Sequence, residues 1–181
     1  MIFTKTELQG ATIVDLERRE DPRGFFARAY CEREFAAQGL PTRMVQTNTS
    51  LTRQAGTLRG MHFQRAPHAE DKLVRCVRGA IWDAIVDIRP DSPTYCKWIG
   101  VELSEENCRM LLVPKGFAHG FVTLTDDAMV TYQVSEFYTP GAEGGARWND
   151  PAFGIQWPVE VIGMSDKDRS WPDFVREGAK A

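Results

Sequence analysis

The sequence predicts an all-β protein, a sandwich or barrel of short strands. Short segments rich in Val, Ile, Phe, Tyr and Thr recur along most of the chain. Turns containing Gly, Pro and Asp separate these segments at regular spacing. Helix-compatible composition is confined to Cys31–Gly39 and to a short stretch around Lys167–Asp173. Many short strands with few helices are typical of β-sandwiches and barrels, with the helices at the periphery.

The chain up to Leu51 is expected to contain two strands, a helix and a polar strand. Asp21–Gly24 forms a turn between the first two strands. Gly39 ends the helix, and Pro41 confirms the break. The last strand alternates polar and less polar residues, which is typical of a solvent-facing strand or of the lining of a wet pocket. The three strands expected here are Thr12–Leu16, Phe25–Tyr30 and Val45–Leu51.

Strands continue through the middle of the chain. Lys72–Val77 and Ala80–Ile88 flank an Arg-Gly turn and predict a hairpin. Beyond Pro140 the chain is rich in Gly and Trp and is expected to be irregular. The other strands expected are Thr57–Gln64, Tyr95–Leu103, Arg109–Val113, Phe117–Leu124 and Ala128–Phe137.

Length and composition indicate a single domain spanning residues 1–181. The formal net charge of −3 implies no basic face for nucleic acid. The four cysteines are scattered without a C-x-x-C pair, which argues against a zinc ribbon and suits a reducing compartment. The sequence shows no signal peptide and no run long enough to span a membrane. We therefore expect a cytoplasmic enzyme or binding protein.

The stretch Gly56–Gln64 combines an anion-binding and a titratable side chain on one expected strand. Arg59 suits a planar anion such as a pyrophosphate, and His62 exchanges protons near neutral pH. In a regular strand these two side chains point to opposite faces. A bulge at Gly60 would bring both into one cavity. The alternative is a surface arginine and a structural core histidine.

The three histidines are His62, His68 and His119. The segment Pro114–His119 has the P-x-G-x-x-H spacing of the second motif of cupin jelly rolls. A metal-binding cupin also requires H-x-H and a glutamate in its first motif, but here Gln64 stands two residues after His62. His68 is out of register and follows a proline. Two imidazoles without a carboxylate make a poor transition-metal site, so we expect a pocket without metal.

Several motifs together resemble one enzyme family. They are Thr57–Gln64, Val45–Asn48, Asp83–Arg89, Val113–Phe121 and Trp148–Pro151, and the resemblance extends from Arg23-Gly24 to Ser165–Asp168. This pattern resembles the dTDP-4-dehydrorhamnose 3,5-epimerase family. The resemblance implies a cupin-type jelly roll, a homodimer and no metal or other cofactor. It also implies epimerisation of a nucleotide-linked 4-keto-6-deoxyhexose, such as dTDP-4-dehydro-6-deoxyglucose to dTDP-4-dehydrorhamnose.

The expected reaction requires a base, an enolate stabiliser and an acid, because a 4-keto group acidifies the hydrogens at C3 and C5. By resemblance, His62 is the base, and Asp168 holds its imidazole in the right tautomer. Lys72 would stabilise the enolate oxygen, and Tyr132 would be the proton donor. Asp83 is a competing carboxylate that could partner either histidine.

Substrate-binding residues are also implied by the resemblance. Arg23 and Arg59 would hold the pyrophosphate with His119 nearby. Structural roles remain open for several of these residues, since lysines and glutamates are usually solvated and buried tyrosines usually pack. The other residues implied to bind substrate are Gln46, Thr47, Asn48, Tyr138 and Glu143.

One departure from the family concerns Arg28. The rhamnose-pathway enzymes commonly carry a glutamate at this position, touching the nucleotide end of the substrate. The charge reversal leaves open another nucleotide, or a 3-epimerase acting at one carbon only. The rival function classes are a non-catalytic sugar-binding cupin and a metal-dependent cupin oxygenase or isomerase.

Overall fold

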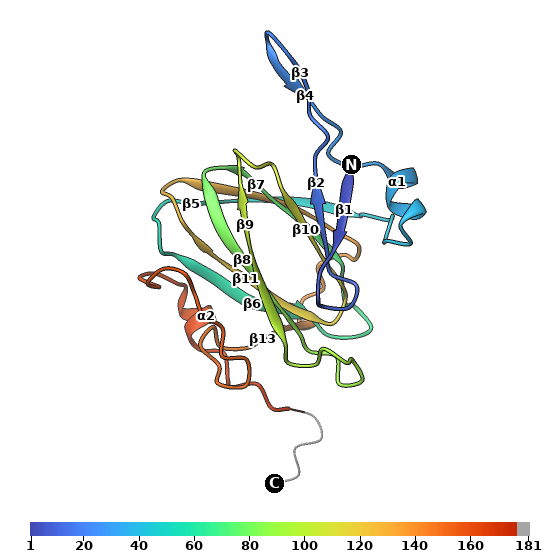
Figure 1. Cartoon of the computed structure of the whole chain (residues 1–181). Helices are drawn as coiled ribbons and strands as arrows, with labels where there is room; N and C mark the ends of the chain where they lie inside the picture. Colours follow the sequence, from blue (N-terminus) through green and yellow to red (C-terminus); the bar gives the residue numbers. More distant parts are fainter. Residues whose placement is uncertain (177–181) are drawn as a thin grey trace.

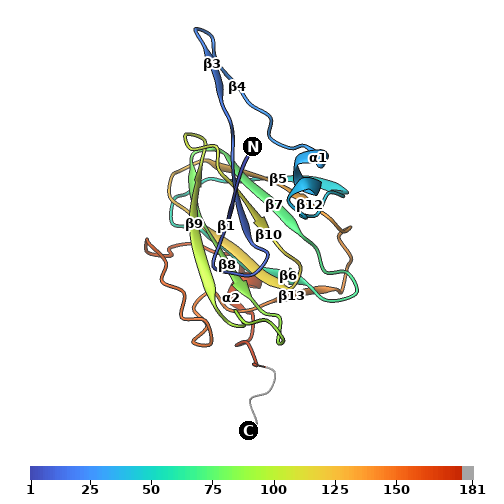
Figure 2. The same cartoon turned by 45° about the vertical axis from the view of Figure 1, so that its right-hand side comes forward.

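Strands that bury one face pair into two antiparallel sheets stacked as a sandwich (Figures 1 and 2). The structure is a computed structural model that describes residues 1–176. One sheet has the order β1-β2-β10-β7-β12-β5, and the other has the order β13-β6-β11-β8-β9. Their strands are β1 (Ile2–Lys5), β2 (Thr12–Asp15), β5 (Gln46–Thr52), β6 (Leu58–Gln64), β7 (Lys72–Arg78), β8 (Ala80–Asp87), β9 (Trp98–Ser104), β10 (Met110–Val113), β11 (Phe117–Thr123), β12 (Ala128–Val134) and β13 (Glu143–Gly145).

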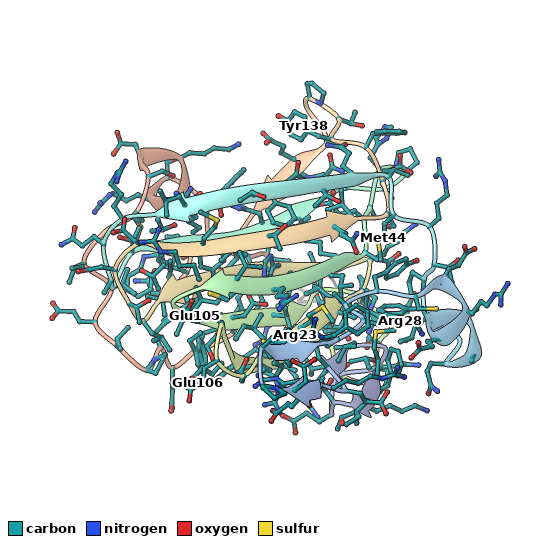
Figure 3. The ribbon with its side chains drawn as sticks, turned by 90° about the horizontal axis from the view of Figure 1, so that it is seen from above. Arg23, Arg28, Met44, Glu105, Glu106 and Tyr138 are labelled. Carbon is teal, nitrogen blue, oxygen red and sulfur yellow. The ribbon has the colours of Figure 1, made fainter. Side chains whose placement is uncertain are left out.

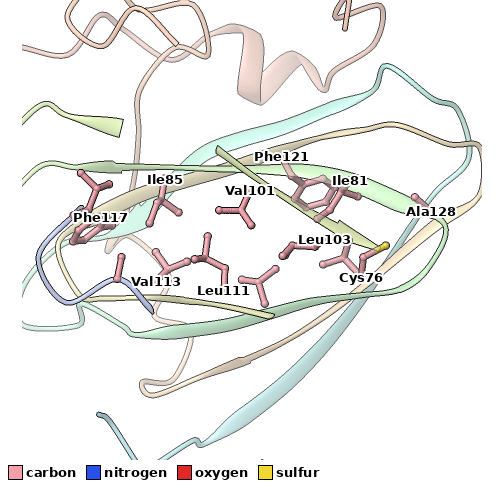
Figure 4. Packing of buried hydrophobic residues seen from close by; sticks show 14 residues of the cluster. Cys76, Ile81, Ile85, Val101, Leu103, Leu111, Val113, Phe117, Phe121 and Ala128 are labelled. Carbon is pink, nitrogen blue, oxygen red and sulfur yellow. The ribbon is translucent and has the colours of Figure 1, made fainter. Parts of the chain in front are cut away.

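The main hydrophobic core fills one end of the sandwich, where β9 faces β7 and β10 (Figure 4). Ile85, Leu103 and Leu111 are fully buried there. Each such side chain stabilises the fold by roughly 1.5–3 kcal/mol on burial. Strand β11 is buried along its whole length, because it lies in the middle of its sheet. This packed end fixes the spacing of the two sheets at their other end, where β5, β12 and β7 face β13, β6 and β11.

The N-terminal segments outside the sandwich form a helix and a projecting hairpin. Helix α1 (Glu32–Ala37) buries Phe35 against Phe3 and Tyr30. Gly39, at a φ of +68°, ends this helix as expected. The hairpin of β3 (Arg19–Asp21) and β4 (Gly24–Phe26) extends away from both sheets (Figures 1 and 2). Its aromatic side chains Phe25 and Phe26 are exposed.

The expected all-β sandwich is confirmed, with corrections at several strand ends. The strand expected over Phe25–Tyr30 corresponds to β4, which ends at Phe26. The strand expected from Tyr95 begins at Trp98, because Thr94–Lys97 form a hydrogen-bonded turn. The last long strand ends at Val134 rather than Phe137, and the C-terminal helix α2 is only Asp166–Arg169. Strands β1, β3 and β13 were not expected.

Two expectations concern the chain as a whole. The single domain over residues 1–181 stays a prediction, and residues 177–181 lie outside the described part. In residues 1–176, no helix has the length and apolar character needed to cross a membrane.

Candidate active site

A cavity of about 530 Å³ opens between the two sheets at the end away from the main core. Its walls carry most of the residues implied by the sequence. One sheet contributes Gln46, Asn48, Lys72 and Tyr132, and the other contributes Arg59, His62, His119 and Glu143. Tyr138, from the segment between β12 and β13, and Asp168, from α2, complete this set.

The bulge expected in β6 is present and brings Arg59 and His62 to the same cavity. His62 pairs with His119 and Arg59 pairs with Phe121, so three steps on β6 face two on β11. Gly60 has a φ of +146°, and a Cβ there would lie 2.5 Å from the Cα of Gly120. Only glycine permits this close approach of the two strands.

His62 and Asp168 form a hydrogen-bonded pair, as the sequence predicted. Asp168 Oδ1 lies 2.6 Å from His62 Nε2, and its Oδ2 accepts from the Gly60 N–H at 3.3 Å. Helix α2 presents this carboxylate because Ser165 caps the helix and accepts from the Asp168 N–H at 3.1 Å. With a proton on Nε2 donated to the carboxylate, Nδ1 is left as the basic nitrogen of His62.

The pair is electrostatically suited to support a charged imidazole. Burial opposes ionisation of Asp168, but hydrogen bonds and the charge of His62 hold its pKa below the ordinary value. Asp168 therefore remains a carboxylate at neutral pH. The indole of Trp171 lies edge-on to the imidazole, with ring centroids 6.4 Å apart.

A second histidine–carboxylate pair lies beside the first. His119 Nε2 is 2.7 Å from Asp83 Oδ1, and both residues are buried. Since His119 faces His62 directly across the β6–β11 ladder, the two imidazoles are neighbours. Asp83 thus partners His119, and the alternative pairing with His62 is wrong.

The pairing of β12 with β5 and β7 determines which side chains form the opposite wall of the cavity. Tyr132 pairs with Asn48, and Val134 pairs with both Gln46 and Lys72. Because side chains alternate along strands, these residues share the inward face of their sheet. His62 and Tyr132 therefore face the cavity from opposite sheets.

Tyr132 and Lys72 are both largely buried in this wall. Burial raises the pKa of Tyr132, and the charge of Glu70 raises it further. The positive charge of Arg59 lowers it, but by less than these two effects together. The phenol thus keeps its proton at neutral pH, as a general acid requires. The Lys72 Nζ lies 3.2 Å from the Glu70 carboxylate.

The rim of the cavity carries charge as well. Arg59 donates from Nε to Thr52 Oγ1 at 2.8 Å, which fixes the guanidinium on the strand edge. Lys167 and Glu143 form an ion pair at 2.8 Å, and this pair lowers the pKa of Glu143. A hydrogen bond to Glu143 raises the pKa of Tyr138.

Two residues implied to bind substrate do not line the cavity of their own chain. Thr47 is exposed on the other face of β5, because alternation places only Gln46, Asn48 and Ser50 inward. Arg23 lies on the projecting hairpin, 89% exposed, and pairs with Asp21. Seen from above, Arg23 and Tyr138 lie well apart (Figure 3).

Arg28, which departs from the family pattern, does not line the cavity. It pairs with Glu34 at 2.8 Å. No group of three or more His, Cys, Asp or Glu side chains within residues 1–176 is arranged to hold a metal ion. The cavity is also lined by residues that were not expected from the sequence. They include Ser50, Glu70, Phe121, Ser165, Lys167 and Trp171.

Comparison with known proteins decides the family. A family model described as dTDP-4-dehydrorhamnose 3,5-epimerase matches residues 5–176. The chain belongs to the dTDP-4-dehydrorhamnose 3,5-epimerase family. A family member from Methanothermobacter thermautotrophicus is 46% identical over 172 residues, covering 93% of this chain and 92% of that protein. Another from Shigella flexneri is 44% identical over 176 residues, covering 97% of each chain.

Solved structures agree with this family assignment. The crystal structure of the Bacillus anthracis dTDP-4-dehydrorhamnose 3,5-epimerase, with TDP and PPi bound, superposes with a TM-score of 0.93 at 43% identity. The superposition covers 96% of this chain and 99% of the Bacillus anthracis chain. The chain is therefore an epimerase of the isomerase class, with a cupin-like β fold. These relatives support the epimerase over a non-catalytic sugar-binding cupin or a metal-dependent cupin oxygenase.

Proposed function

We propose that this epimerase inverts C3 and C5 of a dTDP-linked 4-keto-6-deoxyhexose, converting dTDP-4-dehydro-6-deoxyglucose to dTDP-4-dehydrorhamnose. The observation that carries the proposal is the placement of the His62–Asp168 pair opposite Tyr132 and Lys72 across one cavity. An epimerisation removes a proton from one face of a carbon and returns one to the other. A base and an acid on opposite walls match that requirement.

Each proton transfer uses a defined group. The Nδ1 of His62 takes the proton from C3, and the electron pair of the C–H bond moves to the 4-keto oxygen as an enolate. The ammonium of Lys72 stabilises that oxygen, and Asp168 stabilises the imidazolium. The Tyr132 hydroxyl then protonates C3 from the opposite face as the ketone re-forms. Proton exchange with solvent restores both residues, and the same steps act at C5.

The diphosphate is expected to bind near Arg59, whose guanidinium lies at the cavity on the strand edge. Gln46, Asn48 and Tyr138 offer hydrogen-bonding groups beside it. TDP and PPi are bound in the Bacillus anthracis relative, which supports the same ligand class here.

We also propose a homodimer. The β3–β4 hairpin projects from the sandwich with Phe25 and Phe26 exposed, and such apolar surface favours association. The exposed Arg23 at its tip has no role in its own cavity. In a two-fold dimer the hairpin would bring Arg23 to the cavity of the second copy, where it would contact the diphosphate. We place the enzyme in the cytoplasm, which suits its four free cysteines.

The test is solvent-deuterium NMR with 4-keto-6-deoxyhexoses linked to dTDP or to UDP. We expect deuterium at both C3 and C5 and formation of the rhamnose-configured product from the dTDP sugar. Label at C3 alone would establish a 3-epimerase instead. Preference for UDP would show that Arg28 has changed the nucleotide selectivity. The absence of any label would contradict the proposed catalysis, and loss of label after EDTA treatment would favour a metal-dependent enzyme.

A further inference from the structure

Glu70 is a buried carboxylate in the cavity wall to which the mechanism above gives no role. It lies two residues before Lys72, and its side chain is only 12% exposed. One oxygen, Oε1, lies 3.2 Å from the Lys72 Nζ, whose side chain is 10% exposed. The other oxygen, Oε2, accepts a hydrogen bond from Gln64 Nε2 at 3.0 Å. Each carboxylate oxygen thus has a defined partner.

The Glu70 carboxylate is held from behind by an amide of fixed orientation. Gln64 Oε1 accepts from the Thr139 N–H at 2.8 Å. The two hydrogens on its Nε2 are shared among Glu70 Oε2 and the backbone carbonyls of His68 and Phe137, which lie 3.1 and 3.2 Å away. If the amide were reversed, its NH₂ would face the Thr139 N–H, and its oxygen would face the carbonyls of His68 and Phe137. Nε2 must therefore point to Glu70. Gln64 occupies the position where a metal-binding cupin has a histidine, and here it anchors a carboxylate.

The ammonium of Lys72 depends on Glu70 for its direction. Lysine ends in a flexible four-carbon chain, and a buried ammonium requires an anionic partner. Within residues 1–176, Glu70 is the only carboxylate within ion-pair distance of Lys72. We propose that Glu70 is a positioning residue that holds the Lys72 ammonium toward the cavity and places a negative charge in the cavity that Tyr132 also lines. This inference rests on the proposed roles of Lys72 and Tyr132.

The charge of Glu70 has a second consequence for the acid. Burial raises the pKa of Tyr132, and Glu70 adds to this rise while Arg59 opposes it. Loss of the Glu70 charge would let Tyr132 ionise at lower pH. The charged and titratable groups on the cavity walls around Tyr132 and Lys72 are Glu70 before β7, Arg59 and His62 on β6, His119 on β11, Tyr138 between β12 and β13, Glu143 on β13, and Lys167 and Asp168 on α2.

The test compares Glu70→Gln, Glu70→Asp and the control Glu102→Gln, which changes an exposed glutamate on β9. For Glu70→Gln we expect kcat to fall roughly tenfold to a hundredfold with KM little changed, because Lys72 is misdirected. The alkaline limb of the kcat profile should move to lower pH, because the Glu70 charge no longer raises the pKa of Tyr132. Glu70→Asp keeps the negative charge, so the alkaline limb of its kcat profile should stay at the wild-type pH. Its kcat should still fall, because the shorter side chain misdirects Lys72. Glu102→Gln should match the wild type.

A second readout does not depend on turnover. Ultraviolet titration of tyrosinate, with Tyr132→Phe as the reference, isolates the ionisation of Tyr132 in each Glu70 background. We expect it at lower pH in Glu70→Gln, and unchanged in Glu70→Asp. An unmoved titration in Glu70→Gln, or an unchanged kcat, overturns the inference. If Glu70→Gln does not fold, a moved titration or unchanged kcat in Glu70→Asp overturns it. Absence of turnover in the wild type would instead contradict the proposed function, and the titration would still decide on Glu70.

Discussion

Replacing Asp168 by Asn tests whether the carboxylate sets the tautomer of His62. The two Asp168 oxygens have different partners, since Oδ1 meets His62 Nε2 at 2.6 Å and Oδ2 meets the Gly60 N–H at 3.3 Å. The Gly60 N–H requires an acceptor, so the asparagine oxygen would take that place. The amide NH₂ would then face Nε2 and donate to it. This arrangement moves the ring proton to Nδ1 and leaves the wrong nitrogen basic.

The size of the effect follows from these contacts. A hydrogen bond to a charged group contributes about 1.5–3 kcal/mol. At about 1.4 kcal/mol per tenfold in rate, its loss alone lowers kcat roughly 10- to 150-fold. The inverted tautomer removes the base itself, and general bases typically contribute about 10²–10⁴-fold. We therefore expect Asp168→Asn to lower kcat by about 10²–10⁴-fold.

The assay is epimerisation of the dTDP 4-keto sugar followed by NMR, with Asp166→Asn as the matched control. Asp166 is exposed on the same helix and does not line the cavity. The control should keep wild-type kcat. If the pair acts as a unit, the variant combining His62→Asn and Asp168→Asn should be no slower than His62→Asn alone. A kcat for Asp168→Asn within about threefold of the wild type would refute the reasoning, because even one charge-assisted bond exceeds that.

Lys72→Met should lower turnover and C3 deuterium exchange together by about 10²–10³-fold, since both need the enolate; NMR exchange at the wild-type rate would contradict this role. Arg59→Ala should weaken dTDP binding by roughly 10- to 150-fold in calorimetry, and an unchanged affinity would move the diphosphate elsewhere. Burial opposes ionisation of Asp87, but bonds from Arg89 and neighbouring hydroxyls lower its pKa. Its carboxylate therefore stabilises the fold above its unfolded pKa of about 3.9 and loses this effect as pH falls through the lower folded value. In urea unfolding, Asp87→Asn should reduce the stability gap between neutral and acidic pH, and an unchanged gap would contradict it.

Most of the fold was predictable because the long strands carry their own composition and turn signals. The three missed strands, β1, β3 and β13, lack such signals. Glu143–Gly145 is short and glycine-rich, and it is a strand because it pairs with β6, with Gly145 opposite His62. Ile2–Lys5 similarly depends on its pairing with β2. In both cases the partner strand, distant in sequence, determines the structure.

The candidate site was predicted partly by pattern and partly by resemblance. The period of two, with glycine between Arg59 and His62, predicted the bulge in β6 that the register confirms. The same period separates Thr47 from Asn48, and the exposed Thr47 side chain lies on the outer face of β5, as alternation predicts and the resemblance did not. The pairing of His62 with Asp168 joins residues 106 positions apart, which no local pattern reveals.

Other parts of the site were beyond prediction from one sequence. Glu70 precedes a strand in a polar loop, where glutamates are usually solvated, and its burial depends on contacts with Gln64 and Lys72. Trp171 follows α2 without any periodic signal and reaches His62 only through the fold. Arg23 is exposed and pairs with Asp21, so the binding role that we propose for it requires a second chain, which local sequence patterns do not reveal.

The central claim is that His62 and Tyr132 divide the two proton transfers between opposite walls of one cavity. Deuterium exchange at C3, measured alongside turnover in His62→Asn and Tyr132→Phe, tests it most directly. We expect His62→Asn to lose both exchange and turnover. Tyr132→Phe should lose turnover but keep exchange, because His62 removes a proton and returns a deuteron to the same face. Undiminished epimerisation by Tyr132→Phe would contradict the account and identify Tyr138 or water as the donor.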